Sequence, residues 1–291
     1  MKRMRRILFL GLCLLSSLTG VLAQEVLLGT TGGAAGDLYR IDPTTGVATE
    51  IGFLASGFNV YAVTGLAFDN VTGILYGSTS NKSASSARSL VAIDPSTGAV
   101  TFIGAFGVGS ETMADLTFDG TTATLYGTGS NDGNLYSIDV TTGAATAVGS
   151  SGIAAASING AGVAANSAGQ IFGAPTGANQ QLVQYNKTNG SVTTVATFSG
   201  APAPLGSIDA MAFNAGGTLY GVDIDLDKST HLVTIDTATG AVTDVGASVA
   251  LLDAIVFFNP TAVPEPATLS LLGLSALGSF GLNVLRRHRR N

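Results

Sequence analysis

Apolar and polar residues alternate with a period of two over short segments through the middle of the chain. Residues 37–41 (Asp-Leu-Tyr-Arg-Ile) and 47–51 (Val-Ala-Thr-Glu-Ile) alternate in this way and flank an Asp-Pro-Thr-Thr-Gly loop. Such a unit predicts a β-hairpin in which Asp42 accepts a backbone N–H and Gly46 takes a positive φ. Four more copies follow, and the loops end at glycines 45 to 52 residues apart: Gly46, Gly98, Gly143, Gly190 and Gly240. This period indicates a repeat architecture.

A second pair of strands is predicted between successive hairpins. Residues 65–69 (Gly-Leu-Ala-Phe-Asp) lead through a turn to residues 74–77 (Ile-Leu-Tyr-Gly). The parallel pairs are 115–119 with 125–127, 162–166 with 171–173, and 210–214 with 219–221. Four short strands per repeat are typical of a β-propeller blade. The third copy is degenerate, and a further strand pair within residues 154–165 would raise the blade count from five to six.

The two ends of the array predict a closed ring. Residues 26–30 match the second strand of the inner pair, and residues 254–259 match its first strand, so together they complete one blade. Closure in this way removes the sheet edges that an open array would expose. We therefore predict an all-β, five-bladed β-propeller over residues 24–260, whose fifth blade is shared between residues 24–52 and 252–260.

The first 23 residues have the order of a secretory signal peptide. Basic residues 2–6 precede the apolar run 7–15, and small residues end the segment, which predicts cleavage between Ala23 and Gln24. Cys13 lies inside this leader. The mature chain then has no cysteine, which excludes disulfides and thiol chemistry.

Charge is distributed unevenly along the chain. Residues 24–260 contain five Lys and Arg against eighteen Asp and Glu, a formal charge of −13, whereas the whole chain is at −6. A ring this acidic should repel nucleic acid and anionic surfaces and attract cations.

The C-terminal segment has three parts. A linker (261–266) holds Pro264, Glu265 and Pro266; an apolar segment (267–285) follows; and a tail (286–291) carries Arg286, Arg287, Arg289 and Arg290. Nineteen residues make a helix of about 28 Å, long enough for a hydrocarbon core. We predict a transmembrane helix with the basic tail in the cytoplasm and the ring outside it.

This tripartite order resembles the PEP-CTERM sorting signal of Gram-negative bacteria. The resemblance implies that Pro264-Glu265-Pro266 and the arginine cluster form the sorting motif. It also implies processing by a membrane protease of the exosortase type and delivery to the outer envelope or an extracellular matrix. The ring itself resembles the repeats of uncharacterised secreted bacterial propeller proteins.

Three aspartates are the candidates for catalysis. Asp115, Asp209 and Asp253 lie near the same end of the predicted innermost strands, where a polysaccharide hydrolase or lyase would need converging carboxylates. The register of Asp253 is ambiguous by one residue, and a slip would turn its side chain to the other face. His231 is the only histidine of the ring, so it is the single candidate for the general base of a Ser-His-Asp arrangement. We predict no catalytic residues.

Asp223, Asp225 and Asp227 alternate along one strand and are the candidate ligands for Ca²⁺. The segment resembles the start of a calcium loop, but Lys228 stands where that loop needs Gly and Thr234 where it needs Glu. A solvated blade edge explains the charges better, since edge strands commonly carry charge as protection. The aspartates that begin the hairpin loops are predicted to cap their own turns rather than bind metal.

The recurring aromatic residues are predicted to form the core between blades. Phenylalanine recurs at one position of the innermost strands, as Phe68, Phe118, Phe213 and Phe258. A sugar-binding surface is better sought among the aromatic residues that do not repeat, which are Phe53, Phe58, Tyr61, Phe102 and Phe106.

Together these features predict a non-catalytic propeller of the cell envelope or extracellular matrix that acts as a binding or structural module. Its partners would be the processing protease, the membrane and envelope components or exopolysaccharide. The alternatives are a polysaccharide hydrolase or lyase and a calcium-stabilised adhesin.

Overall fold

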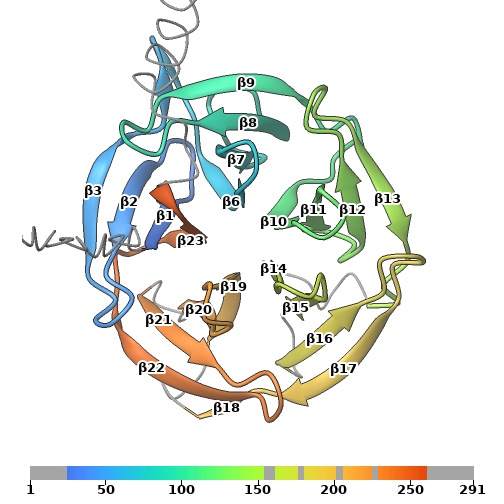
Figure 1. Ribbon diagram of the computed structural model, residues 1–291. Coiled ribbons are helices and arrows are strands. Elements are labelled where there is room, and N and C mark those ends of the chain that lie inside the picture. The colour runs from blue at the N-terminus through green and yellow to red at the C-terminus, as the bar shows by residue number, and fades with distance from the viewer. Residues whose placement is uncertain (1–24, 154–160, 176–179, 201–205, 225–228, 261–291) are drawn as a thin grey trace, which may run out of the picture.

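The computed structural model describes residues 25–153, 161–175, 180–200, 206–224 and 229–260. They form a ring of five blades around a central axis (Figure 1). Every blade is a four-stranded antiparallel sheet whose first strand lies at the axis and whose fourth lies at the periphery. The predicted all-β, five-bladed propeller is confirmed.

Within each blade the strands are named from the axis outward. Blade 1 contains β23 (Leu252–Phe258), β1 (Val26–Thr31), β2 (Asp37–Ile41) and β3 (Ala48–Phe53). Blade 2 contains β6 (Val63–Asp69), β7 (Ile74–Thr79), β8 (Ser89–Ile93) and β9 (Val100–Ala105). Blade 3 contains β10 (Met113–Asp119), β11 (Thr124–Gly129), β12 (Leu135–Ile138) and β13 (Ala145–Gly149).

The degenerate third copy forms a regular blade. Blade 4 contains β14 (Ala161–Ala165), β15 (Ile171–Pro175), β16 (Gln181–Tyr185) and β17 (Val192–Thr197). Blade 5 contains β19 (Ser207–Phe213), β20 (Leu219–Ile224), β21 (Thr230–Ile235) and β22 (Ala241–Ala247). Short segments add β18 (Ser199–Gly200) parallel to β22, and a small hairpin of β4 (Ala55–Ser56) and β5 (Asn59–Val60).

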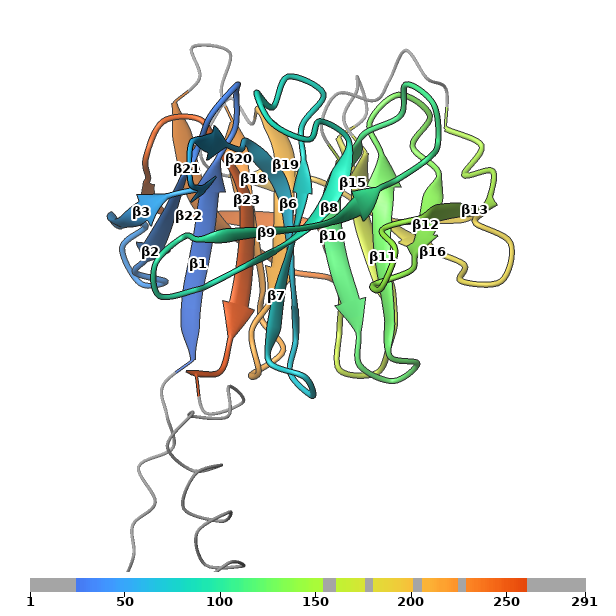
Figure 2. The ribbon, with the colours of Figure 1, turned by 90° about the horizontal axis from the view of Figure 1, so that it is seen from above.

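Blade 1 closes the ring by pairing the two ends of the described chain. Strands β23 and β1 are antiparallel, with Val26 opposite Phe258 and Thr30 opposite Ala254. The two chain ends are therefore side by side at one face of the ring, which we call the proximal face (Figure 2). The opposite face is called the distal face.

The hydrophobic core is divided among the contacts between neighbouring blades. Aromatic residues of one blade's second strand pack on the innermost strand of the next, as in Phe172 against Phe213 (centroids 5.6 Å apart) and Tyr220 against Phe257 (5.0 Å). The predicted interblade role of the aromatic residues is thus confirmed, with one correction. Phe257, not Phe258, is equivalent to Phe213, because Phe257 pairs with Leu27 as Phe213 pairs with Leu219.

The hairpin loops between third and fourth strands join neighbouring blades at the periphery. In blade 3, Gly143 has φ +78° and lies against the backbone of Gly104 in blade 2. A Cβ on Gly104 would lie 1.8 Å from the carbonyl oxygen of Thr142, so only glycine fits there. The same contact joins Gly46 to Gly246, which ties blade 1 to blade 5.

The predicted signal peptide (1–23), the Pro-Glu-Pro linker (261–266), the transmembrane helix (267–285) and the basic tail (286–291) lie outside the described residues. In the part of the chain that is described, no helix has the length and apolar character needed to cross a membrane.

Candidate functional site

Four of the five innermost strands have a β-bulge at their distal ends. The bulged residue is Thr64 in β6, Ala114 in β10, Asp209 in β19 and Asp253 in β23, because pairing shifts there by one residue in each strand. Asp209 and Asp253 are therefore structurally equivalent residues of adjacent blades. A bulge re-aims a side chain, which is how both carboxylates come to lie at the distal mouth of the axis.

Asp115 lies one residue beyond the bulge and is fully buried. Its Oδ2 accepts hydrogen bonds from the backbone N–H of Val163 (2.9 Å) and Met211 (3.2 Å), and its Oδ1 accepts from Leu116 (2.8 Å). A backbone hydrogen bond from Leu66 also favours its ionised form. These four donors hold equivalent positions on β6, β10, β14 and β19, so one carboxylate ties together four of the five innermost strands.

The space for this carboxylate is left by small residues at the same level. The residues equivalent to Asp115 on the other innermost strands are Gly65, Gly162, Ala210 and Ala254. A Cβ on Gly65 would lie 2.7 Å from the Cα of Asp115. Burial raises the pKa of Asp115 well above its ordinary value, against the opposing effect of the backbone N–H donors. Asp115 thus fills the axis and has no oxygen free for a substrate.

Asp209 and Asp253 form a separate acidic pair at the distal mouth. Burial raises the pKa of Asp209 to about 6, with the charge of Asp223 adding to the rise. Burial also raises the pKa of Asp253 to about 7, with the charge of Asp209 adding to it. Gly32 lies against this pair, since a Cβ there would be 2.1 Å from Oδ2 of Asp253. The structure therefore brings together two of the three predicted carboxylates and leaves Asp115 apart.

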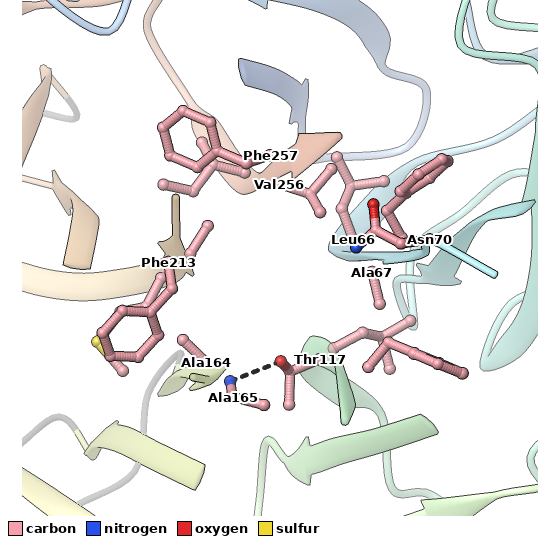
Figure 3. A pocket seen from close by; sticks show the side chains of 15 residues that line it. Leu66, Ala67, Asn70, Thr117, Ala164, Ala165, Phe213, Val256 and Phe257 are labelled. Carbon is pink, nitrogen blue, oxygen red and sulfur yellow. Dashed lines mark hydrogen bonds between the residues drawn. The ribbon is translucent and has the colours of Figure 1, made fainter. Parts of the chain in front are cut away.

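Below Asp115 the axis opens into a small cavity of about 100 Å³ toward the proximal face, and most of its lining side chains are apolar (Figure 3). Ala67, Ala164, Val256 and Phe213 line it, and the Oγ of Thr117 accepts a hydrogen bond from the N–H of Ala165 (2.8 Å). A cavity of this size holds a few waters at most, because one water takes about 30 Å³ of liquid volume. It offers no charged group for chemistry among its lining residues.

Of the three candidate calcium ligands, only Asp223 belongs to the described residues. It is 1% exposed and lies on β20 opposite Ile208 and His231. Asp225 and Asp227 lie outside the described residues. Within the described ranges no group of three His, Cys, Asp or Glu side chains is placed to hold a metal ion.

The hairpin-loop aspartates cap their own turns, as predicted. The Oδ1 of Asp42 accepts hydrogen bonds from the N–H (2.8 Å) and the Oγ1 (2.7 Å) of Thr44, and these bonds lower the pKa of Asp42. Asn186 makes the same backbone contact in blade 4. An amide oxygen serves there as well as a carboxylate, which is the expectation for a turn and not for a metal ligand.

Two buried acidic contacts were not anticipated from the sequence. Lys187 Nζ lies 2.6 Å from Oδ2 of Asp119, joining blades 4 and 3. Burial tends to raise the pKa of Asp119, but the bonds from Lys187 and the turn threonines outweigh it and lower the pKa to about 2. Glu111 is also buried and accepts hydrogen bonds from Asn131 on the facing distal loop, one of them from the backbone N–H at 2.8 Å. The sequence feature that indicates the ion pair with Asp119 is Lys187 itself, because it occupies the loop position that Pro43 and Pro95 hold in other repeats.

The five non-repeating aromatic residues separate into two groups. Tyr61 and Phe106 are 3% and 1% exposed and belong to the core. Phe53, Phe58 and Phe102 are 66%, 107% and 50% exposed, and we call them the flank phenylalanines. They lie on β3, on the β4–β5 hairpin that follows β3 in the chain, and on β9. A bridge between Ala55 of β4 and Ala99, just before β9, links blades 1 and 2 here.

Comparison with known proteins identifies one sequence motif and one fold. Residues 262–290 match the PEP-CTERM protein-sorting motif. A chain from the crystal structure of a nidogen/laminin complex superposes with a TM-score of 0.52 over 80% of this chain and 98% of its own length, at 14% identity. A structural genomics protein of unknown function from Bacteroides thetaiotaomicron VPI-5482 has a TM-score of 0.49 and 17% identity, covering 67% of this chain and 53% of its own. No curated protein matches the sequence.

The chain is a five-bladed β-propeller, and at such low identity the structural likeness shows the fold alone. It carries a PEP-CTERM sorting motif and is therefore an exported protein, sorted through a membrane-anchored form and processed by an exosortase-type system. The motif residues Pro264 to Pro266 and the arginines 286, 287, 289 and 290 fall within this match.

Proposed function

We propose that this protein is a non-catalytic binding module of the cell envelope or extracellular matrix, and that it binds polysaccharide through its flank phenylalanines. The observation that carries this proposal is the exposure of Phe53, Phe58 and Phe102 on neighbouring segments of blades 1 and 2. An exposed ring stacks on the apolar face of a sugar at little entropic cost, because phenylalanine has only two side-chain torsions.

The position of the flank supports this role. The sorting motif follows the last strand, which ends at the proximal face, so the periphery and the distal face stay open to a ligand while the protein is anchored. The high negative charge of the ring argues for a neutral or cation-bridged polymer rather than an anionic one.

The test is retention of the full-length protein, held in detergent micelles, on immobilised bacterial exopolysaccharides and envelope extracts. Phe58→Ser and Phe102→Ser should each reduce retention by about tenfold, the effect of losing about 1.4 kcal/mol of stacking. Val71→Ser is the matched control, because Val71 is 83% exposed on a turn far from the flank. Equal retention by all variants would contradict the proposal.

A second candidate is a polysaccharide hydrolase or lyase that uses Asp209 and Asp253. The observation that favours it is their electrostatic coupling, since a carboxyl with its pKa raised to about 7 is suited to act as a general acid. In the same assay, release of shortened polymer that is abolished by Asp209→Asn would support the enzyme. A Ca²⁺-dependent gain in retention, reversed by chelator, would support the adhesin.

A further inference from the structure

Among the described residues, the turns that join the innermost strand of a blade to its second strand carry no exposed charge. Each innermost strand is joined to the second strand of its blade by a short turn at this face, except in blade 1, where the described chain begins and ends. These turns hang lowest in Figure 2, beside the two chain ends. The exposed residues of this proximal rim are Asn70, Val71, Thr72, Ile74, Gly120, Thr121, Thr122, Ala123, Ser167, Ala168, Gln170, Ala215, Gly216, Gly217, Thr218, Asn259 and Pro260.

Of the three acidic residues of the rim, Asp69 and Asp119 are buried and Glu25 is half-buried. Asp69 is 6% exposed and accepts hydrogen bonds from the N–H of Val71 (2.8 Å) and the hydroxyl of Thr72 (2.6 Å). Asp119 is 0% exposed and is held by Thr121 and Lys187. Glu25 accepts the backbone N–H of Ala215 (3.0 Å). On this side of the ring, the exposed carboxylates lie instead in the outer loops between third and fourth strands, as Asp42, Asp94, Asp139 and Asp236.

The length of the connecting chain fixes how far this rim can stand from the membrane. Six residues, 261–266, separate Pro260 from the apolar segment that begins at Ala267. Even fully extended, this connection spans about 25 Å, at about 3.3–3.6 Å per residue. The β23 strand delivers it at the proximal face, so this is the face that the anchor holds toward the bilayer.

We propose that the proximal rim is the surface with which the anchored ring rests on the lipid headgroups. This inference rests on the membrane-anchored form that belongs to the proposed function. Anionic lipid headgroups repel an exposed carboxylate, just as they attract a Lys or Arg. Amides, hydroxyls, glycine backbone and the exposed side chains of Val71 and Ile74 meet the headgroups without that repulsion and without burying a charge.

The test places a fluorescent probe on each face of the full-length protein. Cys13→Ser removes the chain's single cysteine, and Val71→Cys or Lys82→Cys then labels the proximal rim or the distal face. The proteins are reconstituted into vesicles of phosphatidylethanolamine and phosphatidylglycerol that contain a lipid quencher at headgroup depth. We expect the probe at position 71 to lose most of its fluorescence and the probe at position 82 to keep it.

Charge substitutions provide the matched pair of variants. Ala168→Glu with Gly216→Glu adds two carboxylates to the rim and should reverse the quenching at position 71. Ala238→Glu adds one on an exposed outer turn and should leave the quenching unchanged. Circular dichroism checks that every variant is folded.

Anchoring is measured separately by flotation of the vesicles, so the two proposals fail in different ways. Protein that floats with equal quenching at positions 71 and 82 overturns the rim contact and leaves anchoring intact. Protein that does not float overturns the anchored form on which the inference rests. Quenching that occurs in native inner-membrane vesicles but not in pure lipid overturns the lipid contact and assigns the rim to a membrane protein.

Discussion

Asp115 breaks the pseudo-symmetry of the ring and stabilises it, because this one side chain bonds to four of the five innermost strands. Five innermost strands with equivalent backbones present equivalent N–H groups to the axis, and a buried N–H needs an acceptor. The carboxylate of Asp115 supplies one for four strands at once. A second aspartate at the same level would put two buried charges side by side, which explains why the equivalent residues are Gly or Ala.

Asp115→Ala should therefore destabilise the protein strongly, by about 3–5 kcal/mol, because it leaves several buried N–H groups without an acceptor. Formate or acetate should restore part of the loss, since the emptied site is lined by the same donors. The measurement is the thermal midpoint with increasing formate, with chloride at equal ionic strength as the control. A midpoint indifferent to the anion would mean that the N–H groups have found other partners.

Asp209 and Asp253 predict an unusual dependence of stability on pH. The folded pKa values of about 6 and about 7 lie above the ordinary value of 3.8, so the native state holds more protons than the unfolded state between these limits. Protonation of these two carboxyls therefore stabilises the folded protein at low pH, and this stabilisation is lost as pH rises from about 4 to about 7. Each carboxyl contributes about 1.4 kcal/mol for every unit by which its folded pKa exceeds its unfolded pKa.

Asp253→Asn should flatten this decline and raise stability at pH 8. Urea unfolding at pH 4, 6 and 8 measures it. Asp42→Asn is the control, because the pKa of Asp42 is lowered and Asn already serves at the equivalent position in blade 4. An unchanged slope in the Asp253 variant would show that the pair is solvated in solution.

At the level of elements, the repeating hairpin loops carry the contacts between blades. The alternating pattern predicted each hairpin, but the reason for glycine on the fourth strand, as at Gly104, lies in the neighbouring blade. A local sequence pattern does not show which backbone segment, here about 40 residues away, will approach a strand. In the sequence these glycines therefore indicate only an interruption of the strand.

Gly104→Ala should destabilise the ring by about 1–3 kcal/mol, because its methyl group would overlap the carbonyl of Thr142 and push blades 2 and 3 apart. Gly120→Ala is the matched control: it has no atom within 4 Å of an added Cβ and should be neutral or slightly stabilising. Chemical denaturation of the two variants makes the comparison. Equal midpoints would argue that the peripheral contact is loose.

At the scale of the whole molecule, stability depends on closing the ring between the two ends of the chain. Strand β23 contributes the buried residues Leu252, Ala254 and Ile255 and pairs with β1 along its length. The same strand leads to the sorting motif, so the anchor is attached to the element that completes the fold.

A chain that ends at Ala250 should lose cooperative unfolding, because it exposes β1 as an edge and opens the core between blades 5 and 1. A synthetic peptide of residues 251–260 should restore it, and an Ile255→Asp peptide should not, since Ile255 is fully buried. Melting curves followed by circular dichroism report the recovery. A truncated chain with the melting point of the full-length protein would refute the closure.

The sequence by itself determined the architecture and the cellular address. Period-two alternation with turn residues at fixed offsets is a local property of the chain. Five repetitions of it, with complementary half-blades at the ends, predict a closed ring, and the structure then set the number of blades at five rather than six. The sorting motif is likewise a contiguous signal. Even the degenerate copy around Ile171 kept enough alternation to form a regular blade.

The tertiary structure alone decided the site. Asp115, Asp209 and Asp253 look alike in sequence, yet a one-residue bulge sends two of them to the distal mouth and leaves the third to fill the axis. A one-residue difference in strand alignment likewise places Phe257, and not Phe258, at the position of the repeating phenylalanine. Strand side chains alternate between faces, so a shift of one position reverses a residue's role, and only the pairing of strands distant in sequence fixes that shift.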